Sequence, residues 1–136
     1  MKDKQTGFTL LELIIVVIII GILAVLGLAS FASPKEQAVD REAQANLKLI
    51  SSAEKIYRME TNVYVPCNNT TEINAFLRLM IPTSDNNWKY KINTTSGNTS
   101  FSARALRTSG PYKNTKILCI NETQDNYTNT SCGSAW

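Results

Sequence analysis

A single long apolar run near the N-terminus constrains this chain more than any other feature of its 136 residues. Residues 8–32 are almost purely apolar, and they exceed the roughly 20 residues that a helix needs to cross the hydrocarbon core of a membrane. Lys2 and Lys4 precede the run, and a weakly positive flank favours the cytoplasmic side. The sequence therefore predicts an N-terminal membrane helix whose start lies in the cytoplasm.

A cleaved secretory signal is the alternative explanation of a hydrophobic N-terminus. Such a signal has a shorter apolar core, followed by a cleavage site made of small residues. The letters ASFASPKEQ, at residues 29–37, resemble that kind of site only loosely, and the run before them is too long. Hydropathy alone therefore favours an anchor over a cleaved signal.

One carboxylate, Glu12, stands inside the apolar run, and the next charged residue along the chain is Lys35. An acidic side chain costs about 3 kcal/mol at the centre of a membrane helix and less near its end. Glu12 could therefore reach the membrane interface, or it could have a cationic partner within the membrane. Hydropathy does not decide between these two interpretations.

The six residues from Gly7 to Glu12, GFTLLE, resemble the class III signal of type IV pilins and of the related pseudopilins of type II secretion. The resemblance implies that a prepilin peptidase cuts between Gly7 and Phe8, so that residues 1–7 are a leader peptide. It also implies that the new amino group, on Phe8, is N-methylated. Glu12 matches the acidic residue on which assembly depends in this family.

The resemblance also supplies a partner for Glu12. Cleavage would leave an ammonium group on Phe8, one helical turn from Glu12, and the pair could form within one subunit or between neighbours. In a bundle of such helices both charges are out of water, where an unpaired charge costs several kcal/mol. Pairing would then set the axial register between subunits of a homo-oligomeric helical filament.

The same resemblance implies partners and places in the cell. Besides its own copies, the chain would meet prepilin peptidase, the inner-membrane pilus assembly machinery and, before assembly, membrane lipid. It would begin as a single-pass inner-membrane protein with a cytoplasmic N-terminus and a periplasmic head. After assembly it would be part of an extracellular or periplasmic filament.

A second helical pattern follows the apolar run. Two interpretations fit it: a new helix capped by Ser33, or one long helix over residues 8–60 with a disturbance near that serine. The resemblance favours the long helix, with residues 8–32 as its transmembrane part and later as the filament core. The spacing of apolar residues predicts an amphipathic stripe, made of Ala38, Ala45, Leu49, Ala53 and Ile56 and widened by Leu47, Ile50 and Tyr57.

The remainder of the chain, residues 61–136, predicts a globular β head. A short amphipathic segment is expected around Ile73–Met80, before Pro82. Alternation of apolar and polar residues then predicts two short strands, and a third short strand is expected after them. The three are expected to be antiparallel and packed on the exposed half of the long helix. These strands are expected in NWKYKINTT, TSFSARALRTS and TKILCIN. Helix followed by antiparallel sheet is an α+β fold, and the layout resembles a pilin.

Three cysteines, Cys67, Cys119 and Cys132, lie in this polar part of the chain. Proximity favours a Cys119–Cys132 disulfide, which would close a loop of about 13 residues and contribute roughly 3 kcal/mol. Many pilins carry such a C-terminal loop. The alternatives are Cys67–Cys119 and Cys67–Cys132.

Composition argues against an enzyme. The chain has no histidine, the commonest general base and metal ligand, so no such base is present to activate Cys67 as a nucleophile. Acidic residues of the polar part are too scattered to indicate a calcium site. We therefore expect no catalytic residue, no metal and no cofactor.

Basic residues of the polar part could line one surface and attract DNA: Lys89, Lys91, Arg104, Arg107, Lys113 and Lys116. Nucleic acid is nevertheless not an expected partner, because the net charge is only +3 and is spread along the chain. Three functions remain: a structural subunit of a bacterial type IV pilus, a pseudopilin of a type II secretion system, and a DNA-binding or adhesive minor pilin. The missing calcium pattern weighs against the major pseudopilin, which typically has such a loop. Glu12 favours the body of a filament over its tip, so the pilus subunit is the preferred prediction.

Overall fold

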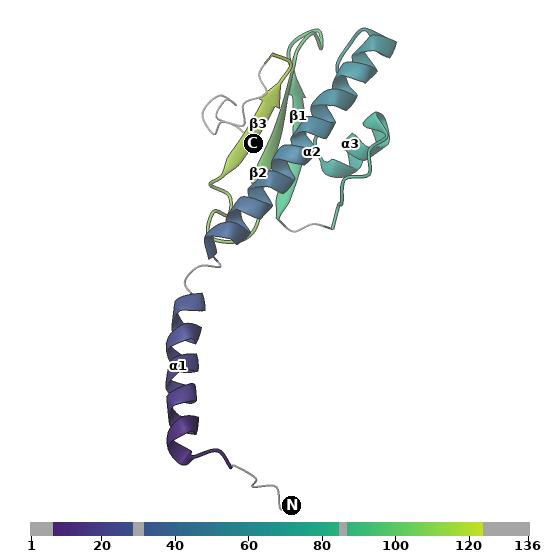
Figure 1. The fold of residues 1–136 in the computed structure, drawn as a ribbon. Coiled ribbons are helices and arrows are strands. Elements are labelled where there is room, and N and C mark those ends of the chain that lie inside the picture. The colour runs from purple at the N-terminus through teal and green to yellow at the C-terminus, as the bar shows by residue number, and fades with distance from the viewer. Residues whose placement is uncertain (1–6, 29–31, 85–86, 124–136) are drawn as a thin grey trace, which may run out of the picture. The chain divides into compact units, whose positions relative to one another are not determined.

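The computed structural model describes residues 7–28, 32–84 and 87–123, without the side chains of residues 26–33. The chain separates into two compact units, Met1–Ala38 and Val39–Trp136, and the second is called the head unit below. Figure 1 labels the helices and strands within each unit. They are α1 (Leu10–Leu28), α2 (Ala32–Thr61), α3 (Thr70–Leu77), β1 (Trp88–Thr94), β2 (Phe101–Arg107) and β3 (Ile117–Asn121).

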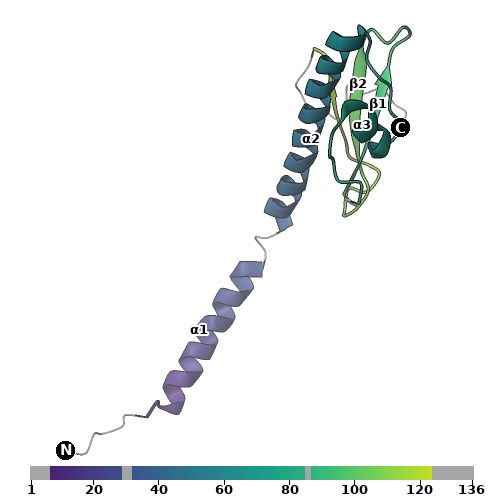
Figure 2. The same ribbon diagram turned by 90° about the vertical axis from the view of Figure 1, so that its right-hand side faces the viewer.

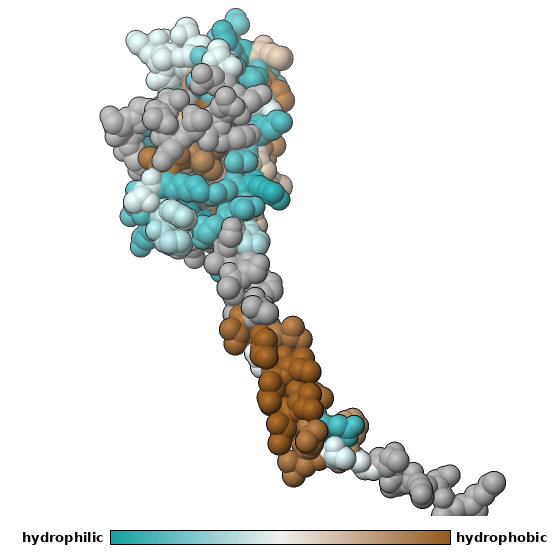
Figure 3. Space-filling model, turned by 60° about the vertical axis from the view of Figure 1, so that its left-hand side comes forward, coloured by the Kyte–Doolittle hydropathy of each residue, from teal (hydrophilic) through white to brown (hydrophobic). Residues whose placement is uncertain are grey.

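Helix α1 presents apolar side chains around its whole circumference. All side chains from Phe8 to Val25 are exposed, and those of Leu10 and Val25 have 79% and 71% of their surface free. Figure 3 shows the visible face of this helix as almost uniformly hydrophobic, with hydrophilic groups only near its start. The helix continues through Gly21 without a break. Because no side of α1 is polar, the helix needs an apolar surrounding on every side.

Residues 8–32 were predicted to cross a membrane. Among the residues that the structure describes, no helix meets the combined length and hydropathy of a membrane span. The predicted continuous helix over residues 8–60 depends on residues 29–31, which lie outside the described residues. Its continuity therefore stays a prediction.

The head unit confirms the predicted α+β class. Its three strands form one antiparallel sheet in the order β1-β2-β3, with Ala103 of the central strand opposite both Ile92 and Ile120. Helix α2 lies along one face of this sheet, and α3 lies beside β1 (Figure 2). Each strand was predicted within one or two residues of its observed ends. Buried and more exposed side chains alternate along β1 and the first part of β2, whereas β3 has three successive buried residues.

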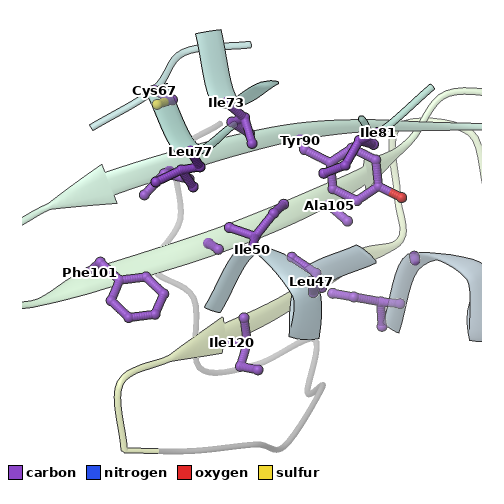
Figure 4. Close-up of a cluster of buried hydrophobic side chains, with 14 of the residues drawn as sticks. Leu47, Ile50, Cys67, Ile73, Leu77, Ile81, Tyr90, Phe101, Ala105 and Ile120 are labelled. Carbon is purple, nitrogen blue, oxygen red and sulfur yellow. The ribbon is translucent and has the colours of Figure 1, made fainter. Parts of the chain in front are cut away.

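The core lies between α2 and the sheet. Figure 4 shows Leu47 and Ile50 of α2 pointing toward Tyr90, Ala105 and Ile120 of the three strands. The alanines of the central strand leave space for the larger side chains of the helix. The whole cluster comprises Ala43, Leu47, Ile50, Tyr64, Cys67, Ile73, Leu77, Ile81, Trp88, Tyr90, Ile92, Phe101, Ala103, Ala105, Leu118 and Ile120.

Two hydrogen bonds between β1 and α2 position the sheet on the helix. Trp88 Nε1 donates a hydrogen bond to the carbonyl oxygen of Val39 at 2.9 Å. Further along the helix, Asn46 Nδ2 donates to the phenolic oxygen of Tyr90 at 2.9 Å. Buried aromatic side chains with a polar tip usually find such a partner, so both rings can fill the core without stranding a polar group.

The stripe predicted for α2 was partly wrong. Leu49 and Ile56 are 46% and 58% exposed, and Ala38 and Ala45 are exposed as well. The row buried against the sheet is Ala43, Leu47, Ile50 and Glu54. Two rows of side chains on this helix could pack on the sheet. The sequence pattern favoured the wrong row, because the row that is buried includes a carboxylate. The other row borders an open hollow of about 270 Å³, shared with Phe76 and Leu79.

Helix α3 begins three residues earlier than predicted and ends earlier too. Its N-cap is Asn69, whose side chain accepts a hydrogen bond from the backbone nitrogen of Glu72 at 2.8 Å. The Glu72 carboxylate in turn accepts from the backbone nitrogen of Asn68 at 2.7 Å. The helix ends at Arg78, which has a left-handed backbone conformation with φ of 54°. Capping, which the apolar pattern does not report, therefore sets these bounds.

Candidate functional site

The start of α1 is held by a reciprocal set of hydrogen bonds between Thr9 and Glu12. The backbone nitrogen of Glu12 donates to Thr9 Oγ1 at 3.3 Å. The backbone nitrogen and the hydroxyl of Thr9 both donate to Glu12 Oε2, at 3.1 Å and 2.9 Å. This is a capping box, and it makes Thr9 the residue that begins the helix.

The capping box fixes how Glu12 is presented. Its carboxylate lies within the first helical turn, where the free backbone N–H groups favour negative charge. No role was predicted for Thr9 from the sequence. The signal that could have found it is the Thr-x-x-Glu spacing directly before an apolar run.

The peptide bond between Gly7 and Phe8 lies just before this helix. Both residues are outside regular secondary structure, and the Phe8 side chain is 80% exposed. A Cβ atom added to Gly7 would meet no other atom within 4 Å. Within the described residues, the fold therefore places no steric demand for glycine at this position.

The predicted pairing of Glu12 with the Phe8 amine requires cleavage between Gly7 and Phe8, because only cleavage creates that amine. In the uncut chain the Phe8 nitrogen is part of a peptide bond, and the Glu12 carboxylate accepts from Thr9 instead. Cleavage, methylation and pairing therefore stay predictions. What the structure adds is a carboxylate held within one helical turn of the Gly7–Phe8 peptide bond.

The cysteines differ in state. Cys67 is a free thiol with 1% of its surface exposed, whereas Cys119, buried in β3, takes part in a disulfide. Cys132 lies outside the described residues, so the pairing Cys119–Cys132 stays a prediction. Burial, followed by the nearby charges of Glu54 and Glu72, raises the pKa of Cys67 to about 12. Cys67 is therefore a neutral thiol at physiological pH and a poor nucleophile.

The basic residues do not all share one surface. Lys91 lies opposite Arg104 in the sheet register. Arg107, by contrast, is buried, with its guanidinium over the Trp88 ring at 5.3 Å. Lys116 forms a salt bridge with a residue of α2. Within the described ranges there is also no group of three or more acidic or cysteine side chains arranged to hold a metal ion.

Comparison with known proteins identifies a known motif in the N-terminal segment. Residues 2–28 match the family model described as "Prokaryotic N-terminal methylation motif", and the match ends at the last residue of α1. The chain thus carries the N-terminal motif of prepilins, which the GFTLLE resemblance predicted.

The full-length relatives fall into two groups. Type II secretion system core protein G of Escherichia coli K12 is 36% identical over 70 residues, covering 52% of this chain and 48% of that protein. The corresponding protein of Vibrio cholerae is 39% identical over 61 residues, covering 45% and 42%. Type IV major pilin protein PilA of Myxococcus xanthus is 34% identical over 96 residues, covering 71% and 40%.

The matched part thus spans less than half the length of each of these relatives. No solved structure matches the chain. The chain is homologous to type IV pilins and to type II secretion core protein G.

Proposed function

We propose that this chain is a structural subunit of a bacterial type IV pilus, processed between Gly7 and Phe8 and assembled through α1 into a helical filament. The observation that carries the proposal is that several features lie together in one segment. The methylation motif, an exposed peptide bond, the Thr9–Glu12 capping box and an apolar helix follow one another within residues 2–28. Residues 1–7 are then the leader, residues 8–60 the long helix and residues 61–136 the head.

The glycine at position 7 supports processing by a peptidase. Because an added Cβ at Gly7 meets nothing, any requirement for glycine arises from the enzyme that must bind the chain there. The bond also lies outside the helix, so a peptidase reaches it without unwinding α1.

Cleavage would change the hydrogen-bond partners of Glu12. The new ammonium group on Phe8 competes with Thr9 for the carboxylate, either within one subunit or across to the next. A charge-assisted bond of this kind is about twice as strong as a neutral one. Only one axial stagger places an amine beside each carboxylate, so the pair sets the register.

Helix α1 supplies the strength of the filament. Membrane lipid covers its apolar surface before assembly, and other copies of α1 cover it afterwards. At about 25 cal/mol per Å² of apolar surface, burying ~1,000 Å² per subunit contributes ~25 kcal/mol before the large costs of association. Such a contact changes little when helices slide, which is why a separate register element is needed.

A pseudopilin of a type II secretion system is the second candidate, favoured by the matches to core protein G. The pilus subunit is preferred because the match to the major pilin covers 71% of this chain, whereas the two matches to core protein G cover 52% and 45% of it. The two candidates differ in the filament made: a surface pilus that can be sheared from cells, or a short periplasmic structure.

The test is to express the chain with prepilin peptidase and measure the intact mass. The expected product lacks Met1–Gly7 and carries one extra methyl group. Gly7→Val should block processing, whereas Gly21→Val, where an added Cβ also meets nothing, should be processed normally. A mature mass that still includes residues 1–7 would overturn the proposal, and sheared surface filaments would separate pilus from pseudopilus.

A further inference from the structure

Glu54 is a carboxylate with no exposed surface in the core of the head unit. It occupies the row of α2 that packs on the sheet, one turn after Ile50. Glu54 Oε2 accepts a hydrogen bond from the backbone nitrogen of Val65 at 3.1 Å. Glu54 Oε1 is buried and has no hydrogen-bond partner in the part of the chain that the structure describes. A carboxylate buried with one oxygen unpartnered is costly when it is charged.

Val65 belongs to the segment Asn62–Cys67, called the crossover segment here, which leaves the end of α2. Backbone hydrogen bonds tie this segment to the hairpin and to β1: Tyr64 N to Asn98 O at 3.0 Å, and Cys67 N to Ile92 O at 3.0 Å. Between these two ties, the Val65 nitrogen donates to Glu54. Glu54 therefore links the middle of the crossover segment to α2.

The charged and titratable groups around Glu54 do not neutralise it. On α2, the Arg58 guanidinium donates to Tyr64 Oη at 3.0 Å and lies 4.9 Å from the centre of that ring. On the crossover segment lies Cys67, and α3 contributes Glu72, whose charge acts on Cys67 together with that of Glu54.

The sheet presents Ile92 and Phe101 to this end of the core, next to the crossover segment. The cations Arg107 and Lys116 contact the opposite end of the helix, through Trp88 and through Asp40. No cation is hydrogen-bonded to the Glu54 carboxylate within the described residues.

We propose that Glu54 is a proton-controlled latch that holds the crossover segment on α2 when neutral and releases it when ionised. A neutral Glu54 carries its proton on one oxygen and accepts from Val65 with the other. Ionisation strengthens that single bond but leaves the second oxygen charged in an apolar site. Water must then reach the carboxylate, which requires the crossover segment to lift from α2. Burial, the dominant effect, raises the pKa of Glu54 to about 7, so the transition falls near neutrality.

Cys67 provides a readout, because it is buried in the segment that would lift and is the free thiol of the described chain. The experiment uses the full chain in detergent micelles with ¹³C-labelled glutamate. It follows two quantities from about pH 5 to about pH 8.5: the chemical shift of the Glu54 carboxyl carbon, and the rate at which iodoacetamide labels Cys67. Glu54→Gln keeps the acceptor for Val65 but does not titrate, and Glu72→Gln is the matched control.

The expected carboxyl midpoint of Glu54 is near pH 7. The labelling rate of the wild type, divided by that of Glu54→Gln at the same pH, should rise about tenfold over this range, and the same ratio for Glu72→Gln should show the same rise. The division removes the pH dependence that the thiols share, and the Glu54 charge, which raises the pKa of Cys67, acts against the expected rise. A Glu54 midpoint near its ordinary value would overturn the proposal, even if Glu54→Gln failed to fold. A constant ratio, or loss of the rise in Glu72→Gln, would also overturn it.

Discussion

Lys116, which precedes β3, forms a salt bridge with Asp40 of α2, 76 positions earlier in the chain. Both side chains are about one quarter exposed, and Asp40 Oδ1 is buried with no hydrogen-bond partner in the described residues. The pair therefore joins the edge strand to the helix at a partly desolvated place. Removing the cation leaves a poorly hydrated carboxylate behind.

Lys116→Met should accordingly lower the free energy of unfolding of the head by about 1–2 kcal/mol, the cost of leaving a buried polar group unpaired. Urea denaturation measures this value. Lys113→Met is the matched control, since Lys113 is exposed in the turn before β3, and it should be neutral within about 0.5 kcal/mol. Equal effects of the two substitutions would contradict a role for the ion pair.

Thr9→Ala should loosen the first turn of α1. Loss of an N-cap costs about 1 kcal/mol, which corresponds to roughly fivefold faster amide exchange in that turn. Exchange of the backbone amide hydrogens of Glu12 and Leu13, monitored by NMR in micelles, measures the effect. Thr9→Ser retains the hydroxyl and should keep the protection, whereas equal protection in Thr9→Ala would show that the cap contributes little.

Two substitutions in α1 should have separable effects on filaments. Glu12→Gln removes the charge and keeps the shape, so it should reduce the yield of assembly while the filaments that form remain resistant to heat and detergent. Ile18→Asn places a polar group in the apolar surface and should weaken the filaments themselves. Yield by quantitative electron microscopy and resistance to detergent are the two measurements. Glu12→Gln filaments that form normally and then fall apart would make the carboxylate a strength element.

The chain from Ser33 onward should fold as a soluble monomer, because α2 already packs its buried row on the sheet. Reduction should lower its free energy of unfolding by roughly 3 kcal/mol if the disulfide is Cys119–Cys132. Peptide mapping by mass spectrometry identifies the bridge. A bridge that includes Cys67, which is free and buried in the structure, would refute this prediction.

The same shortened chain should lose stability as the pH rises from about 4.5 to about 7. The pKa of Glu54 is raised by burial from 4.5 to about 7, so the folded chain retains a proton that the unfolded chain has released. The contribution of Glu54 is fully present below about pH 4.5, is lost progressively up to about pH 7, and amounts to about 3 kcal/mol. Urea denaturation at several pH values measures it. Glu54→Gln should remove this part of the pH dependence, and an identical profile in both proteins would contradict the assignment.

Some parts of this fold were accessible from the pattern of residues alone. Strand β1 was predicted well because alternation has a period of two and the strand has one buried face, as Tyr90 and Ile92 show, whereas successive residues of β3 are buried. The N-terminal methylation motif was predicted from GFTLLE, because such a motif depends on neighbouring residues and not on tertiary contacts. The buried face of α2 was not predicted, because two apolar rows are available and tertiary packing chooses between them.

Glu54 was missed for a related reason. A carboxylate in a helical pattern is normally assigned to solvent, and only the path of the crossover segment brings the Val65 nitrogen to it. Thr9 was missed as well, although its spacing to Glu12 is a local signal that could have identified it. The difference is one of range: a capping box is local in the chain, whereas a buried acid depends on residues that become neighbours by folding.

The uniform surface of α1 has a consequence for rotation. A helix that is apolar at every azimuth has only a weak preference for one angle about its own axis when it packs among identical neighbours. The polar group at the start of α1 is the Thr9–Glu12 capping box, which lies on one side of the first turn. In the proposed filament, a pair formed there would fix the angle as well as the height of each helix, so one carboxylate near the end of α1 would define the handed winding of the whole assembly.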